Sequence, residues 1–352
     1  MKKTTDSSTR KCVSKKRIIL RCFVAFLSFL LLLSASGLLY VKSKLDLLNR
    51  TPISGNEDLT YSDIYEGPYH DVEDSLAEIE HLQNSYEAAQ KIELLNEEHV
   101  ENILLIGSDR RSTSENGRSD SIILVSINHK TKKIHLISLM RALYVCIPKS
   151  SGETWGMLNA AYSWGGPDLL AKTIENNFRI DIDRHVVVDF SSFTTAINLV
   201  GGVSIPLTAA EAQLINADYG TSFRAGNQIL NGEQALFYAR IRKLDNDFVR
   251  TGRQRTVITA LIQQAMRSDI STLNRLANTL LPLISTNFSN SEIFSHISNL
   301  LSYANYDIDQ LMLPIENQSG TSFTGIIYIG GMEMYQVDFS TNIPALFNQI
   351  LN

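Results

Sequence analysis

The sequence predicts an α/β domain in which helices cover both faces of a β-sheet, preceded by one transmembrane helix. Apolar runs of strand length at 101–107, 121–128 and 133–139 are followed by alternating helical and strand patterns, as expected of a sheet packed between helices. The 20 residues of 22–41 contain no charge and can span a hydrocarbon core of about 30 Å at about 1.5 Å per residue. A chain of 352 residues also provides ample material for a hydrophobic core.

The first 21 residues are strongly basic, with eight lysines and arginines and one acid. Subtracting this +7 from the overall −5 leaves −12 for residues 22–352. Basic residues before an apolar span favour a cytoplasmic N-terminus, so we predict a cytoplasmic tail at 1–21 and a signal anchor at 22–41. The chain would then be a single-pass type II protein of the cell membrane with its catalytic domain extracellular. The alternative is a signal peptide cleaved near Ser34-Ala35-Ser36, although apolar residues continue to Val41.

The acidic remainder of the chain argues against a general nucleic-acid-binding protein. Any polyanion that binds there requires a local cluster of cations.

Residues 42–100 are predicted to be an extracellular linker and an acidic helical stem. The segment 42–70 is polar and contains turn-forming prolines and glycines. From 71 to about 98, apolar residues recur at spacings of three and four with acids between them. We favour a solvated spacer helix that caps the domain over a coiled-coil stalk, because three heptads are few for a coiled coil.

The folded domain is predicted to span 101–352. Its first strand ends at Gly107, and the sequence NHKTK predicts a hairpin turn between the next two strands. Periodicity and cap or turn residues predict the later elements. They are helices at 167–178, 191–200, 271–283 and 290–303, with Ser191 or Ser192 capping the second of these, strands at 185–190 and 203–206, and a late β element at 325–339.

The stretch 231–255 has six basic residues in its last sixteen positions. It predicts two helices separated by a break at 244–247, because LDND disfavours a continuous helix. Asn231 is expected to start the first helix, whose buried side would carry Leu236, Phe237 and Ala239.

The arginines of this stretch are expected to meet at one anion. Arg240 and Arg242 share a face only where the chain is extended, whereas Arg250, Arg253 and Gln254 share one face of the second helix. A guanidinium group forms two parallel bonds to phosphate oxygens, so the cluster suits a diphosphate. Two other arginines, Arg255 and Arg111, are expected to pair with nearby acids at the surface instead.

The loop 107–120 carries a second set of charges between two apolar strands. Ligands of open α/β sheets bind beyond the carboxyl ends of the strands, where Asp109 follows the first strand. Asp109 and Asp120 are eleven residues apart and suit Mg²⁺, which is usually held by one or two carboxylates together with substrate phosphates.

Seven blocks of this sequence occur in the order that is seen in the LytR-CpsA-Psr family, across about residues 102–262. They are NILLIGSD, GRSDSIILVSINHKTKKIHLISLMR, LNAAYSWGGPDLL, VVVDFSSF, NLVGGV, LNGEQALFYARIRK and RTGRQR. The resemblance implies an α-β-α sandwich with a central mixed sheet and an apolar pocket for a polyprenyl chain. We expect that pocket to be lined by the helices 191–200, 231–241 and 256–265.

The resemblance also implies roles for individual residues. Asp109 and Asp120 resemble metal-associated catalytic carboxylates, and Arg118 and Arg141 resemble catalytic arginines that contact the diphosphate. The predicted substrate-binding residues are Arg240, Arg242, Arg250, Gln254 and Lys172.

The chain departs from the family pattern beside Arg141. The family more often has Pro before this arginine and Asp after it, where this chain has Met140 and Ala142, and Cys146 replaces a common Asp. The missing Asp puts the local support of Arg141 and catalytic competence in question.

By resemblance, the protein is expected to be a Mg²⁺-dependent phosphotransferase. Its donor would be an undecaprenyl-diphosphate-linked glycopolymer, such as a teichoic acid or capsule, and its acceptor a hydroxyl group of peptidoglycan at the membrane. The alternatives are hydrolysis of the diphosphate, and a non-catalytic module that binds lipid diphosphate or regulates the envelope.

Overall fold

The structure, a computed structural model, describes residues 39–50, 52–59, 75–109, 117–242, 244, 247–303, 305–315 and 325–352. The predicted basic tail and the predicted anchor up to residue 38 lie outside these ranges. The chain divides into two compact units, Met1–Asp46 and Leu47–Asn352. In the first unit, residues 39–45 are helical. Among the described residues, no helix combines the length and the apolar character needed to cross a membrane.

The second unit contains both helices and strands along its whole length. The helices are α3 (Leu76–Ala89), α4 (Leu158–Phe178), α5 (Phe190–Leu199), α6 (Ala209–Tyr219), α7 (Gly232–Ala239), α8 (Asp247–Met266), α9 (Ile270–Leu280), α10 (Asn290–Tyr303) and α11 (Phe339–Leu351). The strands are β1 (Val100–Ser108), β2 (Ser119–Asn128), β3 (Lys133–Leu139), β4 (Tyr144–Lys149), β5 (Gly152–Met157), β6 (Arg184–Asp189), β7 (Val203–Leu207), β8 (Gly226–Leu230), β9 (Ser285–Thr286), β10 (Asp307–Leu313), β11 (Ile326–Ile329) and β12 (Met332–Tyr335).

A six-stranded mixed sheet forms the centre of this unit, in the order β10-β3-β2-β1-β6-β9. β1 pairs in parallel with β6 and β3 with β10, whereas β1–β2, β2–β3 and β6–β9 are antiparallel. Consecutive residues Ile122, Ile123 and Leu124 of β2 are all buried, as expected of a central strand covered on both faces. The predicted mixed α/β fold is therefore confirmed.

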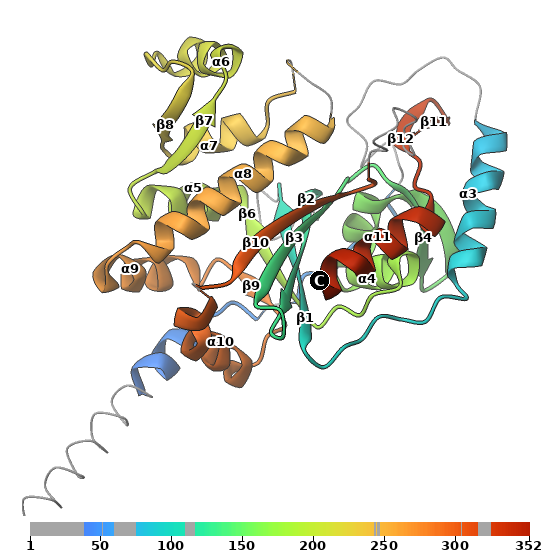
Figure 1. Cartoon of the computed structure of the whole chain (residues 1–352), viewed down its shortest axis with the longest axis horizontal. Coiled ribbons are helices and arrows are strands. Elements are labelled where there is room, and N and C mark those ends of the chain that lie inside the picture. The colour runs from blue at the N-terminus through green and yellow to red at the C-terminus, as the bar shows by residue number, and fades with distance from the viewer. Residues whose placement is uncertain are drawn as a thin grey trace, which may run out of the picture. The chain divides into compact units, whose positions relative to one another are not determined.

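Helices lie on both sides of the sheet (Figure 1). α4 and α11 pack against β2 on one side, and α5 and α8 contact β6 and β3 on the other. α3 is shorter than predicted, and its Leu82, Tyr86 and Ala89 are buried in the same core as α4 and α11. This helix is consequently packed into the domain rather than solvated, because its apolar stripe has a partner in α11.

A second, smaller core joins the β7–β8 hairpin to α6, α7 and α8. α6 and β8 were not predicted, although Thr208 and Glu211 form a capping box at the start of α6. α7 begins as predicted at Asn231, which forms a capping box with Gln234. A Cβ atom on Gly232 would lie 2.2 Å from the Thr194 carbonyl oxygen, so only glycine allows α7 to pack this closely on α5.

Two local predictions were wrong. α5 is capped by Asp189, whose carboxylate accepts a hydrogen bond from the Ser192 backbone N–H, rather than by Ser191 or Ser192. On α7, Ala239 is buried as predicted, together with Ala235 and Tyr238, whereas Leu236 and Phe237 are only partly buried and face a cavity described below.

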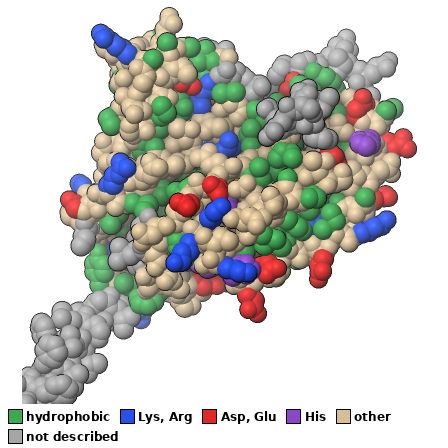
Figure 2. Space-filling view, viewed as in Figure 1, with side chains coloured by type: hydrophobic (Ala, Val, Ile, Leu, Met, Phe, Trp, Pro, Cys, Tyr) green, Lys and Arg blue, Asp and Glu red, His purple; other side chains and the backbone are tan. Residues whose placement is uncertain are grey.

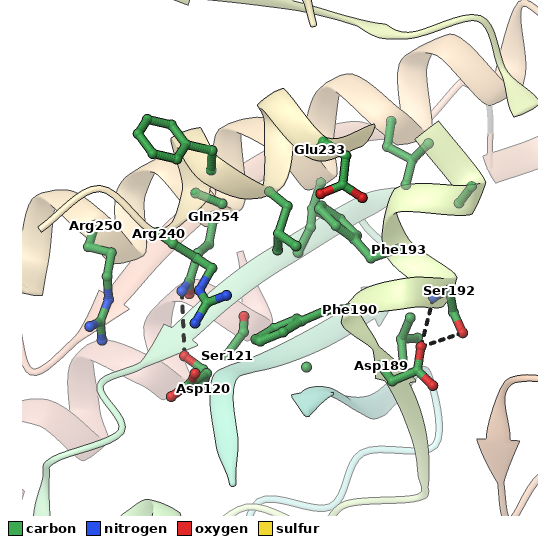
Figure 3. Close-up of a pocket in the computed structure, with 18 of the residues that line it drawn as sticks. Asp120, Ser121, Asp189, Phe190, Ser192, Phe193, Glu233, Arg240, Arg250 and Gln254 are labelled. Atoms are coloured by element: carbon green, nitrogen blue, oxygen red, sulfur yellow. Dashed lines mark hydrogen bonds between the residues drawn. The ribbon is translucent and has the colours of Figure 1, made fainter. Parts of the chain in front are cut away.

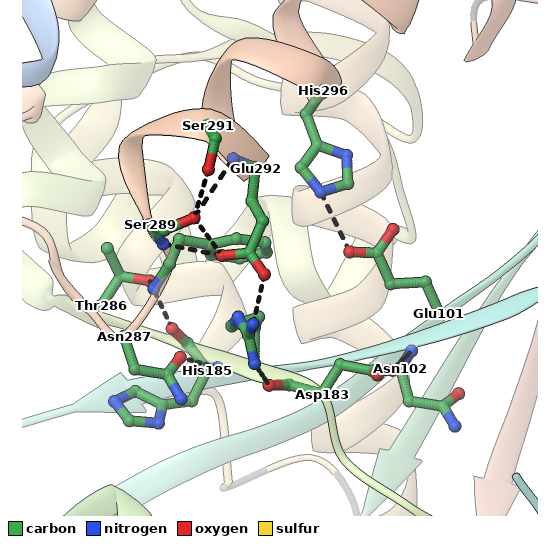
Figure 4. Close-up of polar contacts among 12 residues, drawn as sticks. Glu101, Asn102, Asp183, His185, Thr286, Asn287, Ser289, Ser291, Glu292 and His296 are labelled. Carbon is green, nitrogen blue, oxygen red and sulfur yellow. Dashed lines mark hydrogen bonds and ion pairs between the residues drawn. The ribbon is translucent and has the colours of Figure 1, made fainter. Parts of the chain in front are cut away.

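Polar contacts fasten α10 to the end of the sheet (Figure 4). The Arg184 guanidinium on β6 donates to the Glu292 carboxylate on α10, and His296 Nε2 lies 3.0 Å from Glu101 Oε1 on β1. Arg184 and the Ser289 hydroxyl hold the pKa of Glu292 at about 2. The hydrogen bond with Glu101 raises the pKa of His296 above its ordinary value. α10 is thus tied to two adjacent strands.

The His296–Glu101 contact predicts a pH-dependent contribution to stability. The pKa of His296 is higher in the folded than in the unfolded protein. The contact therefore stabilises the fold fully below the pKa of the unfolded state, about 6.5, and this stabilisation is lost as the pH rises through the pKa of the folded state. The unfolding free energy of the wild type should therefore exceed that of His296→Gln by more at about pH 6 than at about pH 8.5. Denaturant unfolding at both pH values measures this difference. An equal or larger difference at the higher pH would contradict the assigned contact.

Candidate functional site

A cavity of about 780 Å³ lies between one end of the sheet and the helices α5, α7, α8 and α9. Its walls are mainly apolar, and polar side chains gather where the sheet ends (Figure 3). The apolar lining residues include Leu105, Val188, Phe190, Phe193, Leu236, Phe237, Ile258, Leu261, Ile262, Leu280 and Ile284. The predicted pocket, lined by α5, α7 and α8, is confirmed.

The residues of α8 that line the cavity change from polar to apolar along the helix. Arg250 and Gln254 come first, and Ile258, Leu261 and Ile262 follow toward the helix C-terminus. At about 1.5 Å per residue, Arg250 and Ile262 are separated by roughly 18 Å along the helix axis. The cavity therefore has a cationic end and an apolar end, which suits an elongated ligand with an anionic head and an apolar tail.

The end of α7 delivers two further arginines to the cationic end. The helix stops at Ala239, and Arg240 and Arg242 both line the cavity as predicted, although the chain turns at Arg240 (φ −109°, ψ 2°) instead of running extended. The Arg240 guanidinium carbon lies 4.9 Å from the centre of the Phe190 ring. Figure 3 shows Arg240, Arg250 and Gln254 extending toward Asp120 at the end of the sheet. All three of the predicted substrate-binding arginines thus line the same end of the cavity.

The predicted catalytic residues form two ion pairs beside this end of the cavity. Arg118 Nη2 lies 3.0 Å from Asp109 Oδ2, and Arg141 Nη1 lies 2.6 Å from Asp120 Oδ1. The exposed fractions of the four side chains are only 16 to 19%, so water screens these pairs less than surface pairs. Of the four residues, only Asp120 lines the cavity.

Asp120 connects the two sides of the site. Its carboxylate holds Arg141, and its backbone carbonyl accepts a hydrogen bond of 3.4 Å from Gln254 Nε2 on α8. Ala142 leaves Arg141 without the neighbouring Asp that is common in the family pattern. The contact with Asp120 supplies that support from the adjacent strand.

Two residues of the cationic stretch turn away from the cavity. Arg253 is buried and donates to Glu211 Oε1 at 2.7 Å and to the Ile241 carbonyl oxygen at 3.1 Å, so it holds α6 and α7 to α8. Arg255 donates to Gln310 Oε1 rather than to an acid, contrary to the prediction. Lys172 is exposed on α4 and is not among the residues that line the cavity.

The buried Arg253–Glu211 pair predicts a large stability effect. Removal of one partner leaves a buried charge without its counterion, so Arg253→Met should lower the unfolding free energy by about 3 to 5 kcal/mol. Arg267, exposed just after the same helix, provides the control, since Arg267→Met should change it by less than about 0.5 kcal/mol. Chemical denaturation measures both variants. Equal effects would show that the pair contributes nothing specific.

Sequence reasoning missed three acids that also line the cavity, Asp189, Asp218 and Glu233. Asp189 could have been found, because it ends the strand parallel to β1 and so reaches the same sheet edge as Asp109. Asp218 lies at the end of α6, which was not predicted.

The two aspartates allow a test of whether the site suits Mg²⁺. Within the described ranges, no group of three or more His, Cys, Asp or Glu side chains could hold a metal ion. Mg²⁺ does not need such a group when substrate phosphates supply its other ligands. Asp120, at the cationic end of the cavity, fits a metal that is shared with a bound diphosphate, and Asp109, which is paired with Arg118, follows the end of the neighbouring strand.

The sequence that builds this cavity also matches a known protein family. The model of the LytR_cpsA_psr family matches residues 69–342. The chain belongs to this family. The matched region covers α3 through the start of α11, so it includes every cavity-lining residue.

Two curated relatives of this LytR_cpsA_psr protein have different names. The polyisoprenyl-teichoic acid–peptidoglycan teichoic acid transferase TagV of Bacillus subtilis is 37% identical over 199 residues, which cover 54% of this chain and 50% of TagV. The regulatory protein MsrR of Staphylococcus aureus is 32% identical over 217 residues, which cover 61% of this chain and 64% of MsrR. The chain thus spans about half the length of TagV and less than two thirds of MsrR.

A solved structure has the same fold. It is described as the LytR-CPS2A-psr family protein YwtF (TagT) with bound octaprenyl pyrophosphate lipid, from B. subtilis. The TM-score is 0.55 at 23% identity, over 75% of this chain and 95% of that protein.

Proposed function

We propose that this LytR_cpsA_psr protein is a phosphotransferase that attaches a polyprenyl-diphosphate-linked glycopolymer to a hydroxyl group of peptidoglycan. The observation that carries the proposal is the cavity itself, which has three arginines at one end and apolar walls that reach Ile262, roughly 18 Å from Arg250 along α8. The transferase name of TagV and the octaprenyl pyrophosphate held by TagT support the same ligand class. We expect the lipid of the donor to be an undecaprenyl chain and its glycopolymer to be a teichoic acid or a capsular polymer.

The arginines would bind and orient the diphosphate. Each charge-assisted hydrogen bond to a phosphate oxygen contributes roughly 1.5 to 3 kcal/mol net, so Arg240, Arg242 and Arg250 together provide enough to fix the head group. Gln254 donates a hydrogen bond to the Asp120 carbonyl oxygen and so joins this wall of the cavity to the Asp120–Arg141 pair. The prenyl chain would lie along Ile258, Leu261 and Ile262.

The reaction is a displacement at phosphorus. The acceptor hydroxyl oxygen forms a bond to the phosphorus atom that carries the glycopolymer, and it loses its proton. The bond from that phosphorus to the bridging oxygen breaks, and polyprenyl phosphate leaves with the electron pair. Such transfers require mainly positioning and charge stabilisation from the protein, which arginines can provide without a covalent nucleophile.

Asp120 and Asp109 would hold the Mg²⁺ that we propose as cofactor. When bound, a magnesium ion neutralises part of the charge on the phosphate oxygens. The chain's own residues would meanwhile keep the head group in place: Arg141 is fixed by Asp120, and Arg118 by Asp109.

We also propose that the protein is a single-pass membrane protein whose second unit is extracellular. The basic tail 1–21 and the uncharged span 22–41 support this orientation. A lipid-linked donor and the enzyme would then share one membrane surface, and peptidoglycan would be within reach.

Product analysis with purified full-length protein, Mg²⁺, a lipid-linked donor and peptidoglycan fragments tests the proposal. We expect polymer joined to peptidoglycan by a phosphodiester and released polyprenyl phosphate. Free polymer phosphate would identify hydrolysis instead. Tight binding of the donor without either product would identify a regulatory module, a reading that the name of MsrR favours and that the intact support of Arg141 disfavours.

A further inference from the structure

Several large apolar side chains are exposed where α8, α9 and α10 follow one another. We call residues 266–294 the elbow; it comprises the end of α8, all of α9, β9 and the start of α10. Met266, Leu283 and Phe294 are 47%, 44% and 38% exposed within it. The elbow also has no net charge, because Arg267 and Arg275 balance Asp269 and Glu292. The three large apolar side chains are thus exposed in a segment without net charge, among exposed polar and charged residues such as Arg267 and Arg275.

The chain enters the second unit at this elbow. Asn49 pairs with Ser285 of β9, and the Arg50 side chain donates to the Phe288 carbonyl oxygen and to Asn290 Oδ1. Leu47, the first residue of the unit, is itself 37% exposed. Only six peptide bonds separate Leu47 from Val41, the end of the uncharged span, so they are at most roughly 20 Å apart.

The elbow also closes the apolar end of the cavity. Leu280 at the end of α9 and Ile284 just before β9 line the cavity together with Ile262 of α8. The arginines lie at the opposite end, next to the start of α8. A long apolar chain that enters with its head group at the arginines would therefore leave the cavity toward the elbow.

Side-chain contacts and a strand pairing join the elbow and the rest of α10 to the sheet. α10 is joined to β6 through Arg184 and Glu292, and to β1 through His296 and Glu101 (Figure 4). β9 adds an antiparallel contact with β6.

The face of the molecule visible in Figure 2 carries Lys and Arg mixed with Asp and Glu, without a broad region of one charge sign.

We propose that the elbow inserts into the surface of the lipid bilayer, with Met266, Leu283 and Phe294 among the acyl chains. The elbow thereby places the apolar end of the cavity against the membrane, from which the prenyl chain of the donor enters. This inference rests on the proposed function for the identity of the donor, but the membrane contact itself does not depend on activity. An apolar insertion of this kind depends on buried area and little on salt.

Depth-dependent fluorescence quenching tests the contact in the full-length chain. Cys12→Ser and Cys22→Ser leave only the fully buried Cys146, so an environment-sensitive fluorophore can be attached at Leu283→Cys or Phe294→Cys. Ile326→Cys, on the β11–β12 hairpin and 49% exposed, is the matched control. The proteins are reconstituted into phosphatidylcholine vesicles whose acyl chains carry bromine.

We expect quenching at 283 and 294 to be several-fold stronger than at 326, and to persist when salt rises from about 0.05 to about 0.5 M. Equal quenching at all three positions would overturn the proposal. Loss of quenching at high salt would also overturn it, because the contact would then be electrostatic.

A second comparison separates the membrane contact from the chemistry. The double variant Leu283→Asp/Phe294→Asp should lose about tenfold or more of its transfer from a long-chain donor embedded in vesicles. It should keep its transfer from a short-chain donor dissolved in detergent, and Ile326→Asp should keep both. An equal loss with both donors would contradict a role in membrane contact. If no variant and no wild-type protein transferred polymer, the proposed function would fail while the quenching result stood.

Discussion

Replacing Arg240 and Arg242 together by alanine is expected to reduce kcat/KM for polymer transfer by about a hundredfold or more. Both side chains line the cationic end of the cavity, and Arg240 is positioned over the Phe190 ring. A hundredfold loss corresponds to about 2.7 kcal/mol, which is within the value of one or two charge-assisted hydrogen bonds to phosphate. Steady-state kinetics with a lipid-linked donor measures the effect.

Arg224 provides the matched control for this variant. It is exposed just before β8 and does not line the cavity. Arg224→Ala should retain nearly full transfer. The wild type, the double variant and Arg224→Ala should all unfold at similar denaturant concentrations. If the double variant transferred polymer as fast as Arg224→Ala, the assignment of the arginines to the diphosphate would be wrong.

Replacing Asp120 by asparagine should cause a loss of similar size. Asp120 fixes Arg141 at 2.6 Å, lines the cavity and is one of the two carboxylates that we propose as ligands of Mg²⁺. The amide keeps the size of the side chain but removes its charge, so both the contact with Arg141 and the proposed binding of Mg²⁺ should weaken. We expect a loss of about a hundredfold in kcat/KM and a higher Mg²⁺ requirement. Asp307→Asn, exposed on β10, is the control.

A double-mutant cycle separates the two roles of Asp120. If Asp120 acts partly through Arg141, the variant that combines Asp120→Asn with Arg141→Met should lose much less than the product of the two single losses. Full additivity would show that Asp120 and Arg141 act independently, and the contact between them would then have no catalytic role.

Much of the fold was predictable because its signals are local. The three strands that run from 100 to 139 are apolar runs separated by turn residues, and the capping box at Asn231 marks the start of α7. The helix 290–303 was predicted with its observed ends. Two helices were missed: α6, whose apolar residues show little helical periodicity, and the C-terminal helix α11, which contains Pro344. Edge strand β10 was also missed, because only the finished sheet shows which strand it pairs with.

The site was predictable where spacing along the chain decides the geometry. The turn that ends α7 after Ala239 brings Arg240 and Arg242 into the cavity, and helical spacing brings Arg250 and Gln254. Arg253 lies on nearly the same face of α8, but it pairs with Glu211 in the second core. Spacing alone could not show this, because Glu211 lies on α6, a helix that had not been predicted. Nor could it show that Asp120 supports Arg141, since the two residues are joined by strand pairing rather than by sequence.

The most direct test of this account is a structure of the protein with a bound polyprenyl diphosphate. We predict that phosphate oxygens lie within hydrogen-bonding distance of the guanidinium groups of Arg240, Arg242 and Arg250. The prenyl chain should run along Ile258, Leu261 and Ile262 toward Leu280 and Ile284. A diphosphate bound elsewhere, or a prenyl chain outside this cavity, would contradict it.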